Sequence, residues 1–340
     1  MNLPLFLGGL AVFVLAPLTV AVYLLSAIAA EFRKPRIPIL NYHRFLYGPA
    51  VREGRVLDPE RVWAVEDDEF RSQCTALVSA GYRTIIFDEL VAARSGGPAL
   101  PDKPVVLTFD DGYTSNFELA RPIMNELGMR GVFYVTLDPD DHSRQGVAGK
   151  DDWMTAEQLR VLASEGHSVQ SHSVTHGLMS EMTDDQIRWE LNESRARLEQ
   201  ITGKPVQHFC IPRAGGDRRV VRLIGQAGYL TSTGADKGTA GPKQNLLRLP
   251  RIGVPRGTSG ARLLRRLQPA QAAKERVLAD VRLVPTRVLG PRIGYHIRQL
   301  LYGTPWLRRL LQDNLGWLIA TAAMVYAGLA VAWVVRMVGR

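Results

Sequence analysis

Short β-rich runs alternate with helical patterns from residue 37 to residue 254, and this alternation constrains the fold more than any other feature. Parallel strands need a crossover of about a dozen residues or more, which a helix supplies. An α/β barrel occupies roughly 200 to 250 residues, so one barrel with appendages is the default for 340 residues. The strand-like runs are 37–42, 83–87, 105–109, 131–135, 167–171, 207–211 and 229–233.

Two of the helices between these runs have clear start signals. Thr155 with Gln158, and Thr183 with Gln186, each fit a capping box ahead of an apolar period. Gly203 is suited to end the second helix. The buried face predicted for that helix consists of Ile187, Leu191, Leu198 and Ile201.

Two segments at the ends of the chain lack charged side chains and are long enough to cross a bilayer, 3–30 and 315–335. The first exceeds the apolar run of a cleaved signal peptide, which is the alternative reading. The second exceeds a typical buried core helix. Both are predicted as transmembrane helices of an integral cell-membrane protein, with the side of the membrane left open.

The formal charge of +9 indicates which partners to expect. Basic residues gather beside the two spans, which suggests the lipid bilayer as a partner. The range 255–314 is interpreted as a basic connector, either at the membrane surface or simply solvated. Nucleic-acid binding is not expected, because residues 37–254 show no basic stripe with interleaved aromatics. The two cysteines, Cys74 and Cys210, do not define a redox compartment.

Two adjacent carboxylates, Asp110 and Asp111, follow the apolar run 105–109. The carboxyl ends of the strands are where parallel barrels form their active sites. Neighbouring side chains that leave a strand point in different directions, so one can bind a metal while the other moves protons. A simple turn is the alternative reading of Asp-Asp-Gly.

Two histidines four residues apart, His172 and His176, follow the run 167–171. Isolated histidines are mostly structural, but two imidazoles and one carboxylate can bind one metal ion and leave positions open for water and substrate. The two clusters together therefore predict a metal site.

These motifs resemble the polysaccharide deacetylase family, the NodB-homology domains of carbohydrate esterase family 4. The segments Thr-Phe-Asp-Asp-Gly and His-Ser-Val-Thr-His look like its first two motifs, and the resemblance covers 37–254. It implies a distorted (β/α) barrel. It also implies that Asp111, His172 and His176 bind the metal and that Asp110 is the general base. Zinc is the natural ion for such ligands, and cobalt, nickel or iron also fit.

Two further catalytic residues are expected from the resemblance. The segment 209–213 looks like a divergent third motif, in which Arg213 would pair with the base carboxylate; a substrate or surface contact is the alternative for Arg213. The family's late Leu-x-His motif is not found after Val254. His43, which follows the run 37–42, is therefore the candidate general acid, with a structural rim histidine as the alternative.

The predicted function is removal of N-acetyl or other N-acyl groups from a polysaccharide or a lipid-linked glycan. An inactive glycan-binding or assembly subunit on the same barrel is the alternative, suggested by the missing late motif. A two-metal phosphoesterase is a weaker alternative, because the sequence offers ligands for a single ion.

Overall fold

The computed structural model describes residues 36–47, 63–138 and 153–273, with four isolated positions at 22, 26, 29 and 32. The chain divides into two compact units, one formed by residues 1–30 and 277–340 and the other by residues 31–276. The three long described ranges belong to the second unit, and the fold below is that of this unit.

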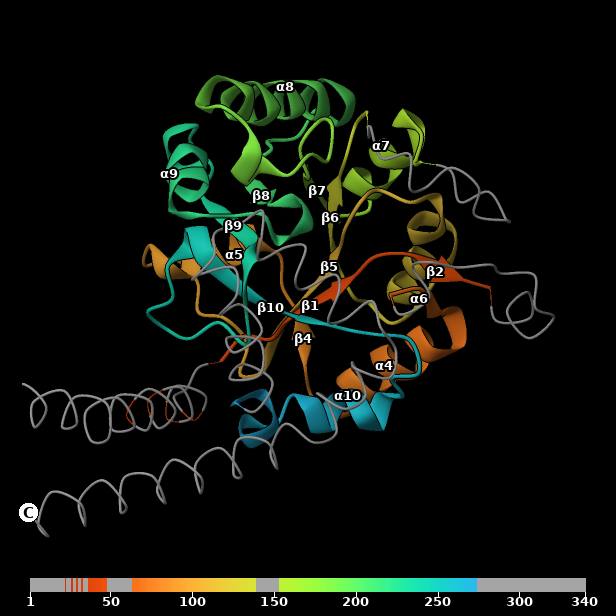
Figure 1. Cartoon of the computed structure of the whole chain (residues 1–340). Coiled ribbons are helices and arrows are strands. Elements are labelled where there is room, and N and C mark those ends of the chain that lie inside the picture. Colours follow the sequence, from red (N-terminus) through yellow and green to blue (C-terminus); the bar gives the residue numbers. More distant parts are fainter. Residues whose placement is uncertain are drawn as a thin grey trace, which may run out of the picture. The chain divides into compact units, whose positions relative to one another are not determined.

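Seven parallel strands close into a barrel (Figure 1). The ring closes because β1 pairs with β10 on one side and with β5 on the other. In order around the ring, the strands are β1 (Ile39–Tyr42), β10 (Leu249–Gly253), β9 (Thr231–Lys237), β8 (His208–Cys210), β7 (Ser168–Ser171), β6 (Val132–Val135) and β5 (Pro104–Phe109). The predicted parallel (β/α) barrel is confirmed.

Three short strands lie beside this ring. β4 (Arg83–Thr84) pairs with the start of β5, while β2 (Phe45–Leu46) and β3 (Val65–Glu66) form a separate parallel pair. The run predicted at 83–87 is therefore shorter than expected, because Phe87 already begins a helix. The sequence interpretation also missed β10, where Pro250 interrupts the apolar pattern that identifies a strand.

Helices surround the strands (Figure 1). The α-helices are α4 (Asp67–Ser79), α5 (Phe87–Arg94), α6 (Arg121–Glu126), α7 (Ala156–Ser164), α8 (Asp184–Thr202), α9 (Arg218–Gln226) and α10 (Gly260–Arg266). Shorter turns are η2 (Asn116–Ala120), η4 (Met179–Glu181), η5 (Pro212–Ala214) and η6 (Leu246–Arg248). Both predicted capping boxes are present, and Gly203 ends α8 in the left-handed conformation.

Alternation along the strands separates two apolar cores. On β5, Leu107 and Phe109 pack with the surrounding helices, while Val106 belongs to a second cluster formed by the opposite faces of the strands. Because Asp110 continues this alternation, its side chain points to the same side as Val106 and Thr108. The pleat therefore brings a carboxylate into the mouth of the barrel.

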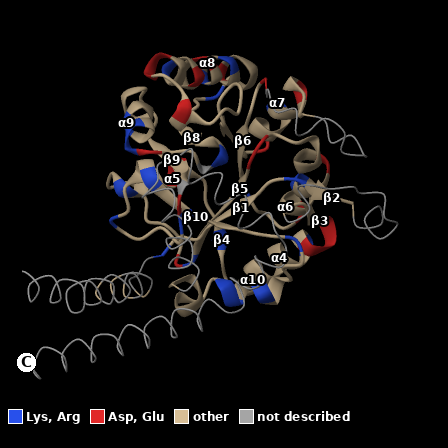
Figure 2. Ribbon diagram, viewed as in Figure 1, with Lys and Arg blue, Asp and Glu red and all other residues tan. Residues whose placement is uncertain are grey.

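Residues 255–273, predicted as the start of a basic connector, pack against the barrel unit. The Gln73 side chain donates a hydrogen bond to the Thr258 carbonyl, and Leu263 on α10 is fully buried. Gly260 lies so close to α4 that a Cβ there would come within 2.3 Å of the Ser72 carbonyl oxygen. In the ribbon of Figure 2, positions of Lys and Arg are marked along α10, and positions of both charges are marked along α8.

The two predicted transmembrane helices require correction. Within the described residues, no helix combines the length and the apolar character needed to cross a membrane. The ranges 3–30 and 315–335 lie almost entirely outside those residues. An uninterrupted apolar run satisfies a length requirement but does not itself establish a spanning helix. The predicted integral membrane location is withdrawn with the helices.

Candidate active site

The two adjacent aspartates leave β5 at the carboxyl end of the barrel. The backbone of Asp111 has a φ of 81°, a conformation that residues other than glycine rarely adopt. Gly112 follows with a φ of 88°, and a Cβ there would lie 3.1 Å from a methyl carbon of Val135. This turn separates the two carboxylates and sends them to different partners.

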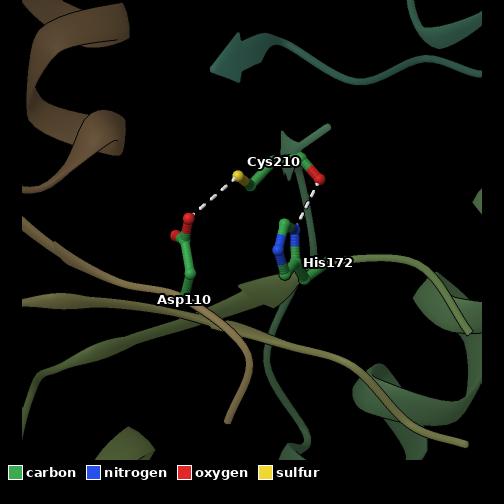
Figure 3. A group of neighbouring side chains, drawn as sticks. All are labelled: Asp110, His172 and Cys210. Atoms are coloured by element: carbon green, nitrogen blue, oxygen red, sulfur yellow. Dashed lines mark hydrogen bonds between the residues drawn. The ribbon is translucent and has the colours of Figure 1, made fainter. Parts of the chain in front are cut away.

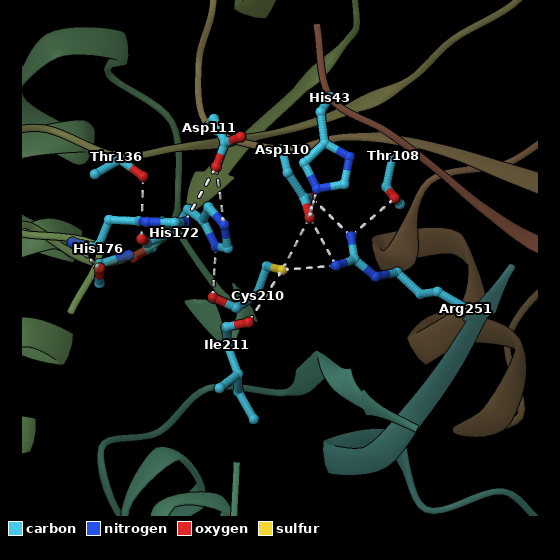
Figure 4. A network of polar contacts seen from close by, with 12 residues as sticks. His43, Thr108, Asp110, Asp111, Thr136, His172, His176, Cys210, Ile211 and Arg251 are labelled. Carbon is cyan, nitrogen blue, oxygen red and sulfur yellow. Dashed lines mark hydrogen bonds and ion pairs between the residues drawn. The ribbon is translucent and has the colours of Figure 1, made fainter. Parts of the chain in front are cut away.

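Asp111, His172 and His176 come together as predicted. The Asp111 Oδ1 atom lies 3.4 Å from His172 Nε2 and 3.2 Å from His176 Nε2 (Figure 4). The potential ligand atoms lie within 4.8 Å of one another, and all three residues are buried. This nitrogen and oxygen donor set suits zinc and its neighbours among the divalent transition metals.

A hydrogen bond fixes the orientation of the His172 ring. Its Nδ1 atom lies 2.8 Å from the carbonyl oxygen of Cys210, which only accepts hydrogen bonds. Nδ1 must therefore carry a proton, which in the neutral ring leaves the lone pair on Nε2, toward Asp111. Metal-binding histidines commonly have such a partner on the second ring nitrogen, so this contact fits a metal site.

The loop between the two histidines is held by Glu190 of α8. The buried Glu190 carboxylate accepts hydrogen bonds from the backbone N–H groups of Val174 and Thr175, at 2.7 and 3.1 Å, and from the Thr175 hydroxyl. Ser173 and His176 both have positive φ, at 72° and 60°. The Ser173 hydroxyl accepts a hydrogen bond from the His176 N–H at 3.0 Å, which secures this strained turn.

Asp110 is paired with Arg251 of β10. The guanidinium donates to both carboxylate oxygens, at 2.6 and 2.7 Å, and to the Thr108 hydroxyl at 3.2 Å. Burial acts to raise the pKa of Asp110, but the charge and the hydrogen bonds of Arg251 act against it, and the pKa lies below its usual value. Burial acts to lower the pKa of Arg251, yet Asp110 raises it overall. Both groups are therefore ionised at neutral pH.

Cys210 contacts both the Asp110 carboxylate and His172 (Figure 3). Its sulfur is 3.6 Å from Asp110 Oδ2 and accepts a hydrogen bond from Arg251 at 3.1 Å. Asp110, His172 and Cys210 also have potential ligand atoms within 4.8 Å of one another. The Arg251 cation contacts two members of this second group and opposes a metal ion there. The Asp111 group is therefore the better candidate.

His43 lies beside Asp110, with its Nε2 3.9 Å from Asp110 Oδ2. Burial lowers the pKa of His43, and the carboxylates of Asp111 and Asp110 partly oppose this effect. The His43 side chain is 27% exposed, compared with 3% for Asp110. The predicted acid is thus the more exposed partner of the buried Asp110.

Arg213 does not occupy the position expected for the partner of Asp110. It is exposed, in the short turn η5, with a φ of 55°. In the structure, Arg251 is the partner of the Asp110 carboxylate. The sequence interpretation missed this residue together with β10. A lone arginine within a short apolar run was the available signal, since a buried arginine needs an acidic partner.

The fold and the site define a parallel barrel with an Asp-His-His group and an arginine-paired carboxylate at its mouth. Residues 97–232 match the family model for polysaccharide deacetylase. The predicted family is confirmed.

Known proteins similar to this chain agree with the family match. YxkH, a polysaccharide deacetylase homologue of Bacillus subtilis, is 24% identical over 226 residues, which cover 66% of this chain and 74% of that protein. The poly-beta-1,6-N-acetyl-D-glucosamine N-deacetylase of Escherichia coli is 38% identical over 111 residues, which cover 31% of this chain and only 16% of that enzyme. The predicted enzyme class, carbohydrate deacetylase, is that of these relatives.

Among solved structures, the deacetylase PplD of Streptococcus pyogenes, in complex with acetate, matches with a TM-score of 0.59. The match covers 69% of this chain and 99% of PplD at 22% identity. Similarity at this level shows that the two proteins share a fold.

Proposed function

We propose that this chain hydrolyses the N-acetyl groups of a glycan in a metal-dependent reaction. One observation carries the proposal: Asp111 Oδ1 lies within 3.4 Å of Nε2 on both His172 and His176. Beside this group, Asp110 is kept ionised by Arg251. A metal-binding group and a separate basic carboxylate are the two requirements for activating water against an amide.

Asp111, His172 and His176 would hold the divalent ion, with zinc the natural choice and cobalt, nickel or iron as alternatives. Such an ion polarises the amide carbonyl and makes water easier to deprotonate. The protein contributes the orientation of its ligands, through Cys210 for His172 and through Glu190 for the loop.

Asp110 would act as the general base and His43 as the general acid. Because Asp110 is ionised, it can accept a proton from the attacking water. His43 Nε2 is 3.9 Å from Asp110 Oδ2, so a proton taken by the base has a short route to the imidazole. The imidazole can then protonate the leaving amine. Arg251 keeps Asp110 in place throughout, and a contact of Arg213 with substrate remains a prediction.

The proposed substrate class is an N-acetylated polysaccharide or oligosaccharide. Support comes from relatives whose names specify N-acetylated glycans, namely poly-N-acetylglucosamine and peptidoglycan. The lipid-linked substrate suggested by the membrane spans loses its basis with them.

Acetate release from N-acetylglucosamine oligosaccharides tests this proposal. We expect release by the purified full chain, loss of release after chelation, and recovery with zinc, cobalt, nickel or iron. Release that resists complete metal removal would contradict metal dependence. Binding of the oligosaccharide without any release, with metal supplied, would support the inactive binding subunit instead.

A further inference from the structure

Trp63 is an exposed aromatic residue beside the candidate acid. It lies just before β3 and is 41% exposed. The centroid of its indole ring is 5.6 Å from the centroid of the His43 ring, with an interplanar angle of 40°. Its exposed surface beside His43 is therefore open to a ligand that approaches the candidate site.

The barrel makes room for this indole at Gly253, the last residue of β10. A Cβ at residue 253 would lie 2.8 and 3.1 Å from two carbons of the six-membered ring of Trp63. The indole therefore packs against bare backbone at the carboxyl end of a barrel strand. Its position is set by the mouth of the barrel, where the candidate site lies.

Solvent reaches the catalytic network at the same place. Side chains of Asp110, Arg251 and His172 are at most 5% exposed, whereas the His43 side chain is 27% exposed. A substrate that reaches Asp110 past His43 lies next to Trp63. The two rings thus border one approach to the base.

We propose that Trp63 is a stacking platform for a pyranose ring of the glycan substrate. One face of such a ring presents C–H groups, which carry small positive charges and pack well on the negative face of an indole. The stacked sugar would be the reacting unit or its neighbour, positioned with its N-acetyl group toward Asp110. This inference rests on the proposed function and adds a substrate-positioning residue to it.

The kinetic test compares Trp63→Ala with Trp63→Phe on N-acetylglucosamine oligosaccharides. We expect Trp63→Ala to raise KM by about tenfold and to change kcat by less than about threefold, because stacking contributes to binding more than to the chemical step. Trp63→Phe should recover part of the loss. Trp189→Ala is the matched control, since Trp189 is 50% exposed on α8 and should leave KM unchanged. An unchanged KM in Trp63→Ala, or an equal loss in the control, would overturn the proposal.

A binding test separates this inference from the proposed function. Calorimetric titration of the same oligosaccharides into Asp110→Asn, with and without Trp63→Ala, measures stacking without turnover. A loss of affinity of about tenfold on removing the indole supports the platform even if the wild-type chain releases no acetate. Equal affinity of the two proteins refutes it even if acetate is released. Absence of binding and of release in every protein would sink both proposals.

Discussion

Arg251 on β10 binds both carboxylate oxygens of Asp110, at 2.6 and 2.7 Å, although 141 residues separate them in sequence. Both side chains are at most 5% exposed. A buried carboxylate needs a compensating charge, and a bidentate guanidinium supplies it with fixed geometry. The pair therefore serves stability and the orientation of the proposed base together.

Replacement of Arg251 by Ala should lower both activity and stability. It would leave a buried carboxylate without its partner, which typically costs about 3 to 5 kcal/mol of unfolding free energy. We expect acetate release to fall by about 10² or more as Asp110 loses its orientation. Arg213→Ala is the informative comparison, because Arg213 is exposed and should change unfolding free energy far less. Equal destabilisation in urea unfolding of both variants would contradict the assignment of Arg251.

Metal analysis should distinguish the proposed base, Asp110, from the proposed metal ligands, His172 and His176. Asp110→Asn is expected to abolish hydrolysis while the protein retains its metal. His172→Ala and His176→Ala should lose both, because each removes a ligand. Metal content by elemental analysis and acetate release on the same preparations provide the check. Equal metal loss in all three variants would rule out this division of roles.

His43→Ala should slow turnover by about 10² to 10⁴, the usual contribution of a positioned general acid. Folding and metal content should stay as in the wild type, since His43 contacts Asp110 rather than the three proposed ligands. Single-turnover acetate release, with circular dichroism and metal content as controls, tests this. Near-normal turnover at saturating substrate would show that a group other than His43 is the general acid.

Glu190→Ala should weaken metal binding without removing a ligand. The substitution deletes the acceptor for two backbone N–H groups and one hydroxyl in the loop that carries His176. Removing a hydrogen-bond partner that orients a metal ligand commonly costs 10- to 100-fold in metal affinity. Glu190→Gln should retain most of the affinity, because an amide can still accept and donate in this position.

Glu193→Ala, one turn further along α8, controls for loss of a carboxylate from the same helix. Competition with a chromogenic chelator measures the affinities. If Glu190→Ala and Glu193→Ala bind the metal equally well, the loop does not depend on Glu190.

His167 should make stability depend on pH. Burial lowers its pKa to about 4, with a smaller opposing effect of Glu165. Its Nδ1 accepts a hydrogen bond from the Gly131 N–H, so Nε2 carries the proton and donates to Asn125. Protonating Nδ1 would break the first bond. The unfolded chain therefore binds this proton more readily than the folded chain.

The resulting stabilisation is fully present above about pH 6.5 and is lost as the pH falls toward 4, by up to roughly 3 kcal/mol. Urea unfolding across this range should show a flatter pH dependence for His167→Gln than for the wild type. If the unfolding free energies of His167→Gln and the wild type change equally with pH, His167 is not the source of the pH dependence.

Local patterns in the sequence were sufficient for most strands of the barrel and for its helix ends. Capping at Thr155 and Thr183 depends on residues three positions apart, and the left-handed end at Gly203 depends on one residue. The adjacency of Asp110 and Asp111 after an apolar strand likewise placed them at the barrel mouth. Such features are readable because their interacting groups are neighbours along the chain.

The apolar ends of the chain show the limit of composition. The runs 3–30 and 315–335 meet a length criterion for membrane spans, but the described helices do not include a spanning one. Hydropathy describes the polarity of the side chains along the sequence, and it does not by itself determine the structure that they form.

The sequence alone determined the residues most suited to bind a metal and to accept a proton, because Asp110, Asp111, His172 and His176 lie in short motifs. Only the tertiary structure decided that Arg251, rather than Arg213, pairs with Asp110, and that Trp63 lies beside His43. The reason is physical: closing the ring places β10 and β5 on either side of β1. Contacts across a closed barrel join distant segments, and no local pattern specifies which arginine or which tryptophan will face the site.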